Sequence, residues 1–233
     1  METFLTLGYE QETDVPPEFV DDVRTPEAYV RHFLREYTEE GDVVLDPFAG
    51  FGTTLLVAEE LGRVPYGVEY EEDRVAVVRD RVSADHAEHV IRGSALELDS
   101  HDLPPFDCCL TSPPYMVEGM ETNPFRNYAT DSESDYDRYL ADVREVFAQL
   151  RQLASSDVTL LVDVSNVKFE GDVTTLAWDV ADAVSESFHF RGEVVVGWKG
   201  EDQDDRDGGT YGYGYDHSYC LVFGTGEEES ETK

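Results

Sequence analysis

The stretch that decides the fold is Asp46-Pro47-Phe48-Ala49-Gly50-Phe51-Gly52-Thr53-Thr54. It follows a short apolar run, Val43–Leu45, which is typical of a buried strand, and it precedes a helical pattern over residues 53–61. Two glycines in a strand-to-helix turn let the backbone pass close to a ligand and leave N–H groups at the helix start free. A tight connection alone would also account for the glycines, so further signals are needed to identify a site.

The turn fits neither of two common nucleotide-binding patterns. The third glycine of the dinucleotide fingerprint would fall at Leu55, and no Gly-Lys-Ser/Thr follows as in a P-loop. The sequence therefore argues against NAD and ATP as ligands.

Strand and helix patterns alternate on both sides of this turn. The predicted strands are Val43–Leu45, Val64–Val68, His89–Arg92, Phe106–Leu110, Val158–Val164, Arg191–Trp198 and Ser218–Phe223. The predicted helices begin at Thr25-Pro26 and at about Thr53, and span Glu71–Val82, Asp135–Leu153 and Val173–Val184. No helix separates the last two strands, so they are expected to be antiparallel. The alternation predicts an α/β three-layer sandwich on a mostly parallel sheet, with a ligand at the carboxyl ends of the strands.

Three segments follow from this pattern. Residues 1–24 are acidic and poorly periodic and are expected to form an N-terminal arm. Residues 25–224 are expected to form the single domain, and residues 225–233 a disordered acidic tail.

Two further motifs lie at predicted strand ends. Glu69 closes the strand after the glycine turn, where an acid can bind both hydroxyls of a ribose. Thr111-Ser112-Pro113-Pro114-Tyr115 follows a later strand; its prolines remove two N–H donors and leave bare carbonyls in a rigid turn, with a Tyr ring beside them. Taken singly, the Glu could be one of many surface acids and the Pro-Pro turn could be a packing loop.

The two turns together resemble the S-adenosylmethionine-dependent amino-methyltransferases of DNA. The likeness is greatest to the cytosine-N4 branch, whose site motif usually starts with Ser. It runs from about Thr25 to Phe223 and includes the ending Gly197-Trp198-Lys199 and His217–Phe223. The resemblance implies a Rossmann-like class I methyltransferase fold, with a mostly parallel seven-stranded sheet, a C-terminal antiparallel hairpin and helices on both faces.

The resemblance also implies roles for individual residues. The cofactor S-adenosyl-L-methionine would be bound through its methionine part, its ribose and its adenine by Asp46, Pro47, Phe48, Gly50, Gly52, Thr53, Glu69, Tyr70 and Ser94. Glu69 would take the ribose and Tyr70 the adenine. Ser94 follows Gly93 where the family commonly has Asp, which puts that adenine contact in doubt.

The second motif is expected to carry the methyl transfer. An exocyclic base amine is a poor nucleophile, and acceptors on its two hydrogens favour a pyramidal nitrogen. We expect the Ser112 hydroxyl and the Pro113 carbonyl, in the turn with Pro114, to accept from the amine while Tyr115 stacks on the base. Transfer would be direct, with no covalent enzyme intermediate and no metal. A carbon-5 cytosine mechanism needs a thiolate nucleophile at the site, and neither Cys108 nor Cys109 fits, since both precede the motif inside the strand.

The net charge of the chain predicts that the protein works in concentrated salt. There are 52 acidic against 17 basic residues, a formal net charge of -35, and only Lys168, Lys199 and Lys233 are lysines. Because the acids are dispersed along the whole chain, we expect a halophilic protein whose self-repulsion is screened in concentrated salt. Phosphate contacts should then be few, from Arg126, Arg206 and Lys199, and base stacking should supply most of the affinity.

The expected substrate is DNA, and three hypotheses remain open. An RNA methyltransferase similar to the tRNA guanine-N2 enzymes is the first alternative, and a non-catalytic nucleic-acid-binding subunit is the second. The inserts Met116–Glu133 and Glu201–Asp216 are candidate base-contacting loops. A restriction or specificity partner is possible, and the oligomeric state is open. Three cysteines without disulfide spacing, and no long apolar run, predict a cytoplasmic protein without a membrane span.

Overall fold

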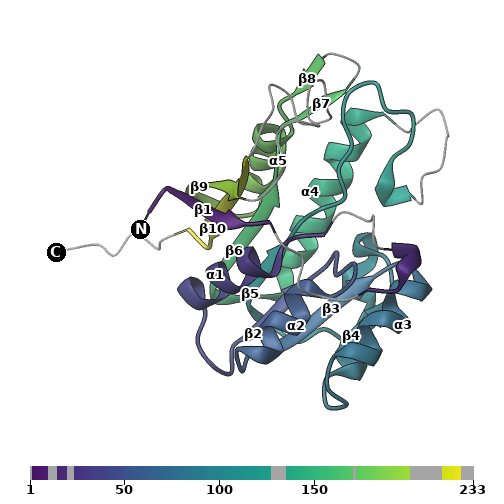
Figure 1. Ribbon diagram of the computed structural model, residues 1–233. Helices are drawn as coiled ribbons and strands as arrows, with labels where there is room; N and C mark the ends of the chain where they lie inside the picture. Colours follow the sequence, from purple (N-terminus) through teal and green to yellow (C-terminus); the bar gives the residue numbers. More distant parts are fainter. Residues whose placement is uncertain are drawn as a thin grey trace.

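The computed structural model describes residues 2–9, 15–19, 24–126, 135–169, 172–199 and 217–226. Its central sheet has eight strands in the order β1-β9-β10-β6-β5-β2-β3-β4 (Figure 1). The strands are β1 (Phe4–Gly8), β2 (Val43–Asp46), β3 (Val64–Glu69), β4 (Val90–Arg92), β5 (Phe106–Thr111), β6 (Ala154–Val164), β9 (His189–Lys199) and β10 (His217–Gly224). The helices are α1 (Glu27–Tyr37), α2 (Thr53–Glu60), α3 (Glu72–Arg81), α4 (Tyr136–Leu153) and α5 (Leu176–Ser185).

The strand directions confirm the predicted sheet. β4, β3, β2, β5 and β6 pair in parallel, and β10 is antiparallel to both β6 and β9. Because β2 lies between β3 and β5, the chain reverses its direction of winding there, and the carboxyl ends of β2 and β5 flank the switch point of strand order.

Residues near the N-terminus, expected to form an arm, include a strand of the sheet. β1 pairs in parallel with β9, from Phe4 opposite Val195 to Gly8 opposite Lys199. The sheet therefore gains an eighth strand at its edge. The two strands are far apart in the sequence, so no local sequence pattern predicts their pairing.

Two other boundaries differ from expectation. Pro26, not Thr25, is the N-cap residue of α1, and Thr25 directs its hydroxyl to Asp163 on β6 instead. The expected helix Val173–Val184 begins only at Leu176, because Asp172–Thr174 forms strand β8, which pairs with β7 (Val167–Phe169) in a separate antiparallel hairpin.

Apolar residues on the two faces of the sheet form separate cores. One face packs against α4 and α5 through residues such as Leu160, Val162 and Phe147; the other packs against α1 through Leu161, Val196 and Phe33. This alternation along β6 is what a strand covered on both faces requires.

The three cysteines belong to these cores. Cys108, Cys109 and Cys220 are free and fully buried. Burial raises the pKa of each thiol well above its ordinary value, because the thiolate would lose its hydration.

Candidate cofactor and substrate site

The glycine turn is a compact bend at the carboxyl end of β2. Gly50 and Gly52 have φ angles of 52° and 79°, in the left-handed region that favours glycine. The Gly52 N–H donates to the Ala49 carbonyl at 2.7 Å, and the Ala49 N–H donates to the Val68 carbonyl at 3.0 Å. A Cβ on Gly52 would stand 2.6 Å from Cγ1 of Val78, so the turn needs glycine there both for its backbone angles and for space.

Glu69 ties this turn to the end of β3. Its Oε2 accepts from the Gly50 N–H at 2.8 Å, and its Oε1 accepts from the Glu71 N–H at 2.8 Å. Burial raises the pKa of Glu69, although both backbone donors and Arg74 favour its charged form. Each carboxylate oxygen has a second lone pair, so Glu69 can still accept from two hydroxyls of a ligand.

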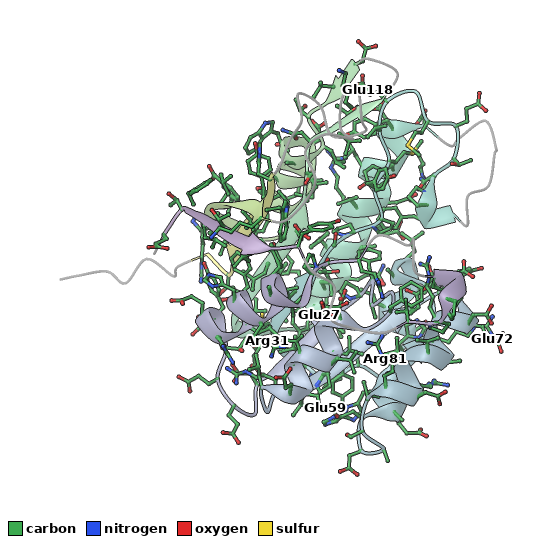
Figure 2. All side chains as sticks on the ribbon, in the orientation of Figure 1. Glu27, Arg31, Glu59, Glu72, Arg81 and Glu118 are labelled. Atoms are coloured by element: carbon green, nitrogen blue, oxygen red, sulfur yellow. The ribbon has the colours of Figure 1, made fainter. Side chains whose placement is uncertain are left out.

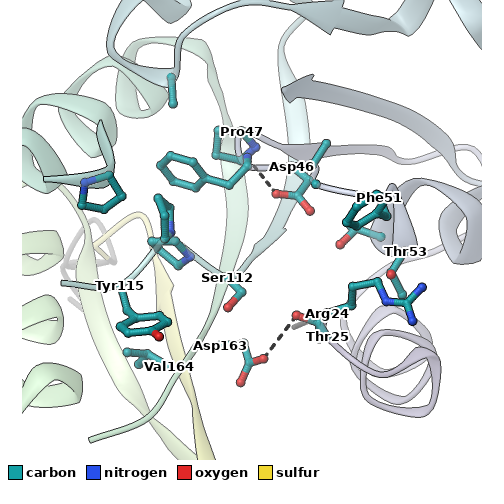
Figure 3. A pocket seen from close by; sticks show the side chains of 18 of the residues that line it. Arg24, Thr25, Asp46, Pro47, Phe51, Thr53, Ser112, Tyr115, Asp163 and Val164 are labelled. Carbon is teal, nitrogen blue, oxygen red and sulfur yellow. Dashed lines mark hydrogen bonds between the residues drawn. The ribbon is translucent and has the colours of Figure 1, made fainter. Parts of the chain in front are cut away.

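Asp46 joins the two motifs. Its Oδ1 accepts from the Thr111 hydroxyl at 2.6 Å and from the Phe48 N–H at 3.0 Å. Burial raises the pKa of Asp46 to about 6, partly offset by hydrogen bonds from Thr111, Phe48 and Thr54. The bond to Thr111 holds the start of the Ser112–Tyr115 turn beside the glycine turn, as Figure 3 shows for Asp46 and Ser112.

A cavity of about 490 Å³ opens between the two motifs. Its lining includes nearly every residue that the sequence assigned to cofactor or substrate: Asp46, Pro47, Phe48, Gly50, Thr53, Glu69, Tyr70, Ser94, Ser112, Pro113, Pro114 and Tyr115. Gly52 is the exception, because its α-carbon faces Val78 of α3. A cavity of this size lies in the range that holds a nucleoside-sized ligand.

One aromatic ring and one helix-capping residue complete the cofactor side. Tyr70 is 48% exposed at the cavity, where its ring is free to lie against a flat ligand. Ser94 accepts from the Leu96 N–H at 3.2 Å and so caps the short helix Ala95–Ser100. Its hydroxyl keeps its O–H donor and a second lone pair, so Ser94 can still contact a ligand at the cavity wall.

Part of the N-terminal segment packs against the glycine turn, a contact that sequence reasoning missed. The ring of Phe19, in the short helix Pro17–Phe19, lies 5.0 Å from the ring of Phe51. The guanidinium groups of Arg24 and Arg74 lie 5.9 Å and 5.1 Å from the same ring. Phe51 is therefore enclosed by one ring and two cations, which is favourable for an aromatic face.

Asp163 is the second feature that sequence reasoning missed. It lies near the end of β6 and lines the cavity (Figure 3). Its Oδ2 accepts from the Thr25 hydroxyl at 3.4 Å, and its Oδ1 is buried without a hydrogen-bond partner among the described residues. Burial raises the pKa of Asp163 to about 6, against smaller effects of the Ser218 and Thr25 hydroxyls. The sequence feature that could have identified Asp163 is that it is the single acidic residue in the apolar run Val158–Val164.

The position of Asp163 relative to Ser112 follows from strand register. β5 and β6 are parallel neighbours with Thr111 opposite Val162, so Ser112 follows β5 at the level of Asp163. Val162 belongs to the core on the α4 side, whereas the alternate residue Leu161 faces α1. Asp163 therefore faces α1, and Figure 3 shows its carboxylate below the Ser112 side chain. The Asp163 carboxylate is thus on the strand next to the Ser112–Tyr115 turn. Apart from Tyr115, that turn has no titratable side chain.

The expected phosphate contacts are only partly described. Lys199 is exposed at the end of β9, and its neighbour Trp198 lines the cavity. Arg206 and the whole insert Glu201–Asp216 lie outside the described residues, as do residues 127–133 of the insert Met116–Glu133 and the side chain of Arg126. Within the first insert, Phe125 is buried against Phe48, at 5.4 Å between ring centroids, so this ring packs and does not project toward solvent.

Acidic residues of the described part of the chain are not gathered in one patch. Figure 2 shows Glu59, Glu72 and Glu118 on separate parts of the molecule. Among the described residues, no group of three His, Cys, Asp or Glu side chains is arranged to hold a metal ion. None of the described helices combines the length and the apolar character that crossing a bilayer requires.

Comparisons with known proteins agree with this geometry. A family model described as DNA methylase matches residues 12–80. The chain is 39% identical over 61 residues to the Type II methyltransferase M2.DpnII of Streptococcus pneumoniae (26% of this chain, 23% of that protein). It is 35% identical over 82 residues to the Type II methyltransferase M.BglII of Bacillus subtilis (35% of this chain, 21% of that protein). The matched segments thus span under a quarter of these relatives.

Solved structures extend the likeness to most of the chain. TrmN from Thermus thermophilus superposes with a TM-score of 0.61 at 17% identity, covering 90% of this chain and 52% of that one. The glycopeptide N-methyltransferase MtfA, complexed with sinefungin, gives a TM-score of 0.55 at 13% identity, covering 97% and 94%. Fold and family match together indicate S-adenosylmethionine as the cofactor, and the cavity beside Glu69 fits it. The chain has the fold of the class I S-adenosylmethionine-dependent methyltransferases, and its segment 12–80, which contains the glycine turn, matches the DNA methylases.

Proposed function

We propose that this protein methylates an exocyclic amine of a DNA base, with cytosine-N4 as the target. The observation that carries the proposal is that Glu69 and the Ser112–Tyr115 turn line one cavity, with Asp46 bonded to Thr111 between them. The matched DNA methylase segment and the Type II methyltransferase relatives support DNA as the substrate. Ser at position 112 favours cytosine-N4 over adenine-N6.

The residues on the cofactor side of the site would bind and orient S-adenosylmethionine. Glu69 would accept from the two ribose hydroxyls with its remaining lone pairs, while Tyr70 would lie against the adenine. The Asp46–Thr53 turn would hold the methionine part. S-adenosylmethionine, when bound, supplies an electrophilic methyl group on sulfur.

The residues on the substrate side would make the target amine more nucleophilic. The Ser112 hydroxyl and the Pro113 carbonyl would accept from the two amine hydrogens, which draws the nitrogen lone pair out of conjugation with the ring. Tyr115, 47% exposed at the cavity, would stack on the base and align it. A base from a duplex must first leave the stack, at a cost of a few kcal/mol.

The last requirement is an acceptor for the surplus proton. When the N–CH₃ bond forms and the S–CH₃ bond breaks, the amine nitrogen becomes cationic and must lose one hydrogen as a proton. Ser112 and Pro113 cannot take that proton, whereas the Asp163 carboxylate in the same cavity can. With a pKa of about 6, Asp163 is ionised at neutral pH and can return the proton to solvent.

A methyl-transfer assay tests the proposal. The protein in molar KCl is given tritiated S-adenosylmethionine with duplex DNA, single-stranded DNA or total tRNA, and the modified nucleosides are identified by mass spectrometry. N4-methylcytosine in DNA supports the proposal. N6-methyladenine would move the target to adenine, N2-methylguanine in tRNA would favour the RNA enzyme, and cofactor binding without any transfer would favour a non-catalytic subunit.

Variants separate the roles of Ser112 and Asp163. Ser112→Ala should lower kcat far more than it weakens cofactor binding. In the wild type kcat should rise with pH as Asp163 ionises, and Asp163→Asn should lower kcat and flatten that profile between pH 5 and pH 8. Equal losses of kcat and of cofactor affinity in both variants would mean that these residues only support the fold.

A restriction or specificity partner and a halophilic, cytoplasmic setting belong to the same proposal. The dispersed carboxylates and the net charge of -35 support high salt as the working solvent. Retention of the folded state in molar KCl, with unfolding on dialysis to low salt, is the expected behaviour. Equal stability at both salt concentrations would oppose it.

A further inference from the structure

A row of aromatic rings leads away from the cavity across the end of the sheet. His217, which lines the cavity, lies 5.3 Å from Tyr219 between ring centroids, and Tyr219 lies 5.0 Å from Trp178. His217 and Tyr219 come from the start of β10, and Trp178 from the first turn of α5. We call His217, Tyr219 and Trp178 the aromatic row.

The outer end of this row is open to solvent. Trp178 is 43% exposed, one of the few large apolar side chains with such exposure among the described residues. Trp178 lies near Asp179 and Asp182 on α5. The other large apolar residues of this helix are buried, so the helix packs on the core without the Trp178 ring. The adjacent Asp179 carboxylate accepts from the Tyr136 hydroxyl at 2.7 Å, a bond that engages this nearby negative charge.

The inner end of the row is continuous with the predicted substrate side. Tyr219 is opposite Val164 in the β10–β6 register, and Val164 lines the cavity. Tyr115 lines the same cavity as Val164. A base stacked on Tyr115 would therefore have an aromatic surface for its neighbour on the far side of β6.

Two lysines follow strand ends that line the cavity, because Val164 ends β6 and Trp198 lies one residue before the end of β9. Lys168 is opposite Val173 in the β7–β8 hairpin that precedes α5, and Lys199 ends β9 beside Trp198 of the cavity. They are the two lysines within the described residues of a chain with a net charge of -35. Positive charge near these strand ends favours a polyanion, and aromatic rings favour flat bases over the outside of a duplex.

We infer that the aromatic row binds the bases of an unpaired DNA strand next to the target base, so that single-stranded DNA is the preferred substrate. This inference rests on the proposed function and narrows its substrate. The rings supply sequence-tolerant stacking, which suits a surface with too few cations to grip a duplex by its phosphates. Bases in a duplex stack on one another and offer these rings only their edges.

The test uses binding of a short dye-labelled oligo(dT), followed by fluorescence anisotropy in KCl. Thymine has no exocyclic amine, so this probe reports on stacking without any methyl transfer. Trp178→Ala should bind oligo(dT) at least about fivefold more weakly, the lower limit for losing one base–aromatic stack, and Trp178→Phe should restore much of the binding. Phe4→Ala is the matched control, because Phe4 is a 62% exposed aromatic residue four positions from the cavity end of β1.

Two further measurements separate loss of DNA binding from loss of folding and measure the contribution of phosphate contacts. Calorimetric titration with S-adenosylmethionine should give the same affinity for all variants, which shows that they are folded. One phosphate contact each from Lys168 and Lys199 would contribute about -1.4 to the slope of log K against log salt, at about -0.7 per contact for a single strand.

The inference fails if Trp178→Ala binds oligo(dT) as the wild type does, or if the wild type binds a duplex of equal length more tightly than the single strand. Either result leaves the proposed methylation standing, because the methyl-transfer assay measures that separately. Conversely, Trp178-dependent oligo(dT) binding together with no methyl transfer to any substrate would retain the aromatic row and overturn the proposed function.

Discussion

Gly52→Ala is expected to destabilise the protein through two separable effects at the start of α2. Gly52 has a φ angle of 79°, which costs an L-residue about 1–2 kcal/mol. Its new Cβ would also stand 2.6 Å from Cγ1 and 3.0 Å from Cγ2 of Val78. Overpacking of this kind costs about 1–3 kcal/mol. The substitution also lowers the conformational entropy of the unfolded chain, which offsets about 0.4–1 kcal/mol, so the net loss of stability should be about 1–4.6 kcal/mol.

Gly41→Ala provides the matched control. Gly41 has a φ angle of 94°, but a Cβ there meets nothing within 4 Å. It should therefore lose only about 1 kcal/mol, from backbone strain alone. The difference between the two variants isolates the clash with Val78, which is a side chain buried in the small core beneath α3.

The assay is urea unfolding in molar KCl, followed by far-ultraviolet circular dichroism, with both variants compared at equal m-value. Equal losses for Gly52→Ala and Gly41→Ala would refute the packing argument. A loss below about 1 kcal/mol for Gly52→Ala would refute both arguments, since the turn would then adopt another conformation at little cost.

Three further predictions concern the cavity. Glu69→Gln should weaken S-adenosylmethionine binding about 10-fold or more in calorimetric titration, because hydrogen bonds to a charged acceptor are lost; unchanged affinity would show that Glu69 only holds the turn. Phe19→Ala should raise the cofactor Kd about 2- to 10-fold by removing the ring that covers Phe51, whereas an unaltered Kd would show that this contact does not support the site. Ionised Asp46 should destabilise the protein by on the order of 3 kcal/mol above pH 6, a cost absent below pH 4, because its folded pKa of about 6 exceeds its ordinary value of 3.8. Asp46→Asn should therefore lessen the fall in unfolding free energy between pH 4 and pH 7, and an identical fall in urea titrations would contradict the buried charge.

The parts of the fold that were predictable are those in which local pattern and tertiary structure agree. The strand before Asp46 and the helix after Gly52 could be recognised because a buried parallel strand is short and apolar, and because the turn between them needs glycine. The amphipathic spacing within α4 likewise gave its bounds to within one residue, with Asp135 as the side-chain cap of the helix.

The parts that were not predictable depend on contacts between distant segments. None of the five residues of β1 is fully buried, so β1 lacks the apolar run of a buried strand, and only its pairing with β9 identifies it. Val173 was placed in a helix because apolar spacing continues from β8 into α5, and only the pairing with Lys168 separates them. Asp163 was read as part of an apolar strand, because its exposure to the cavity arises from the neighbouring strand ends and from Thr25.

The burial of all three native thiols has a practical consequence for labelling. Because Cys108, Cys109 and Cys220 are inaccessible and their thiolates are disfavoured, maleimide reagents should leave the folded wild type unmodified. One cysteine introduced at an exposed position, such as Phe4 at the sheet edge, would then be the sole reactive thiol. A spectroscopic probe could be attached there without first replacing any residue of the core.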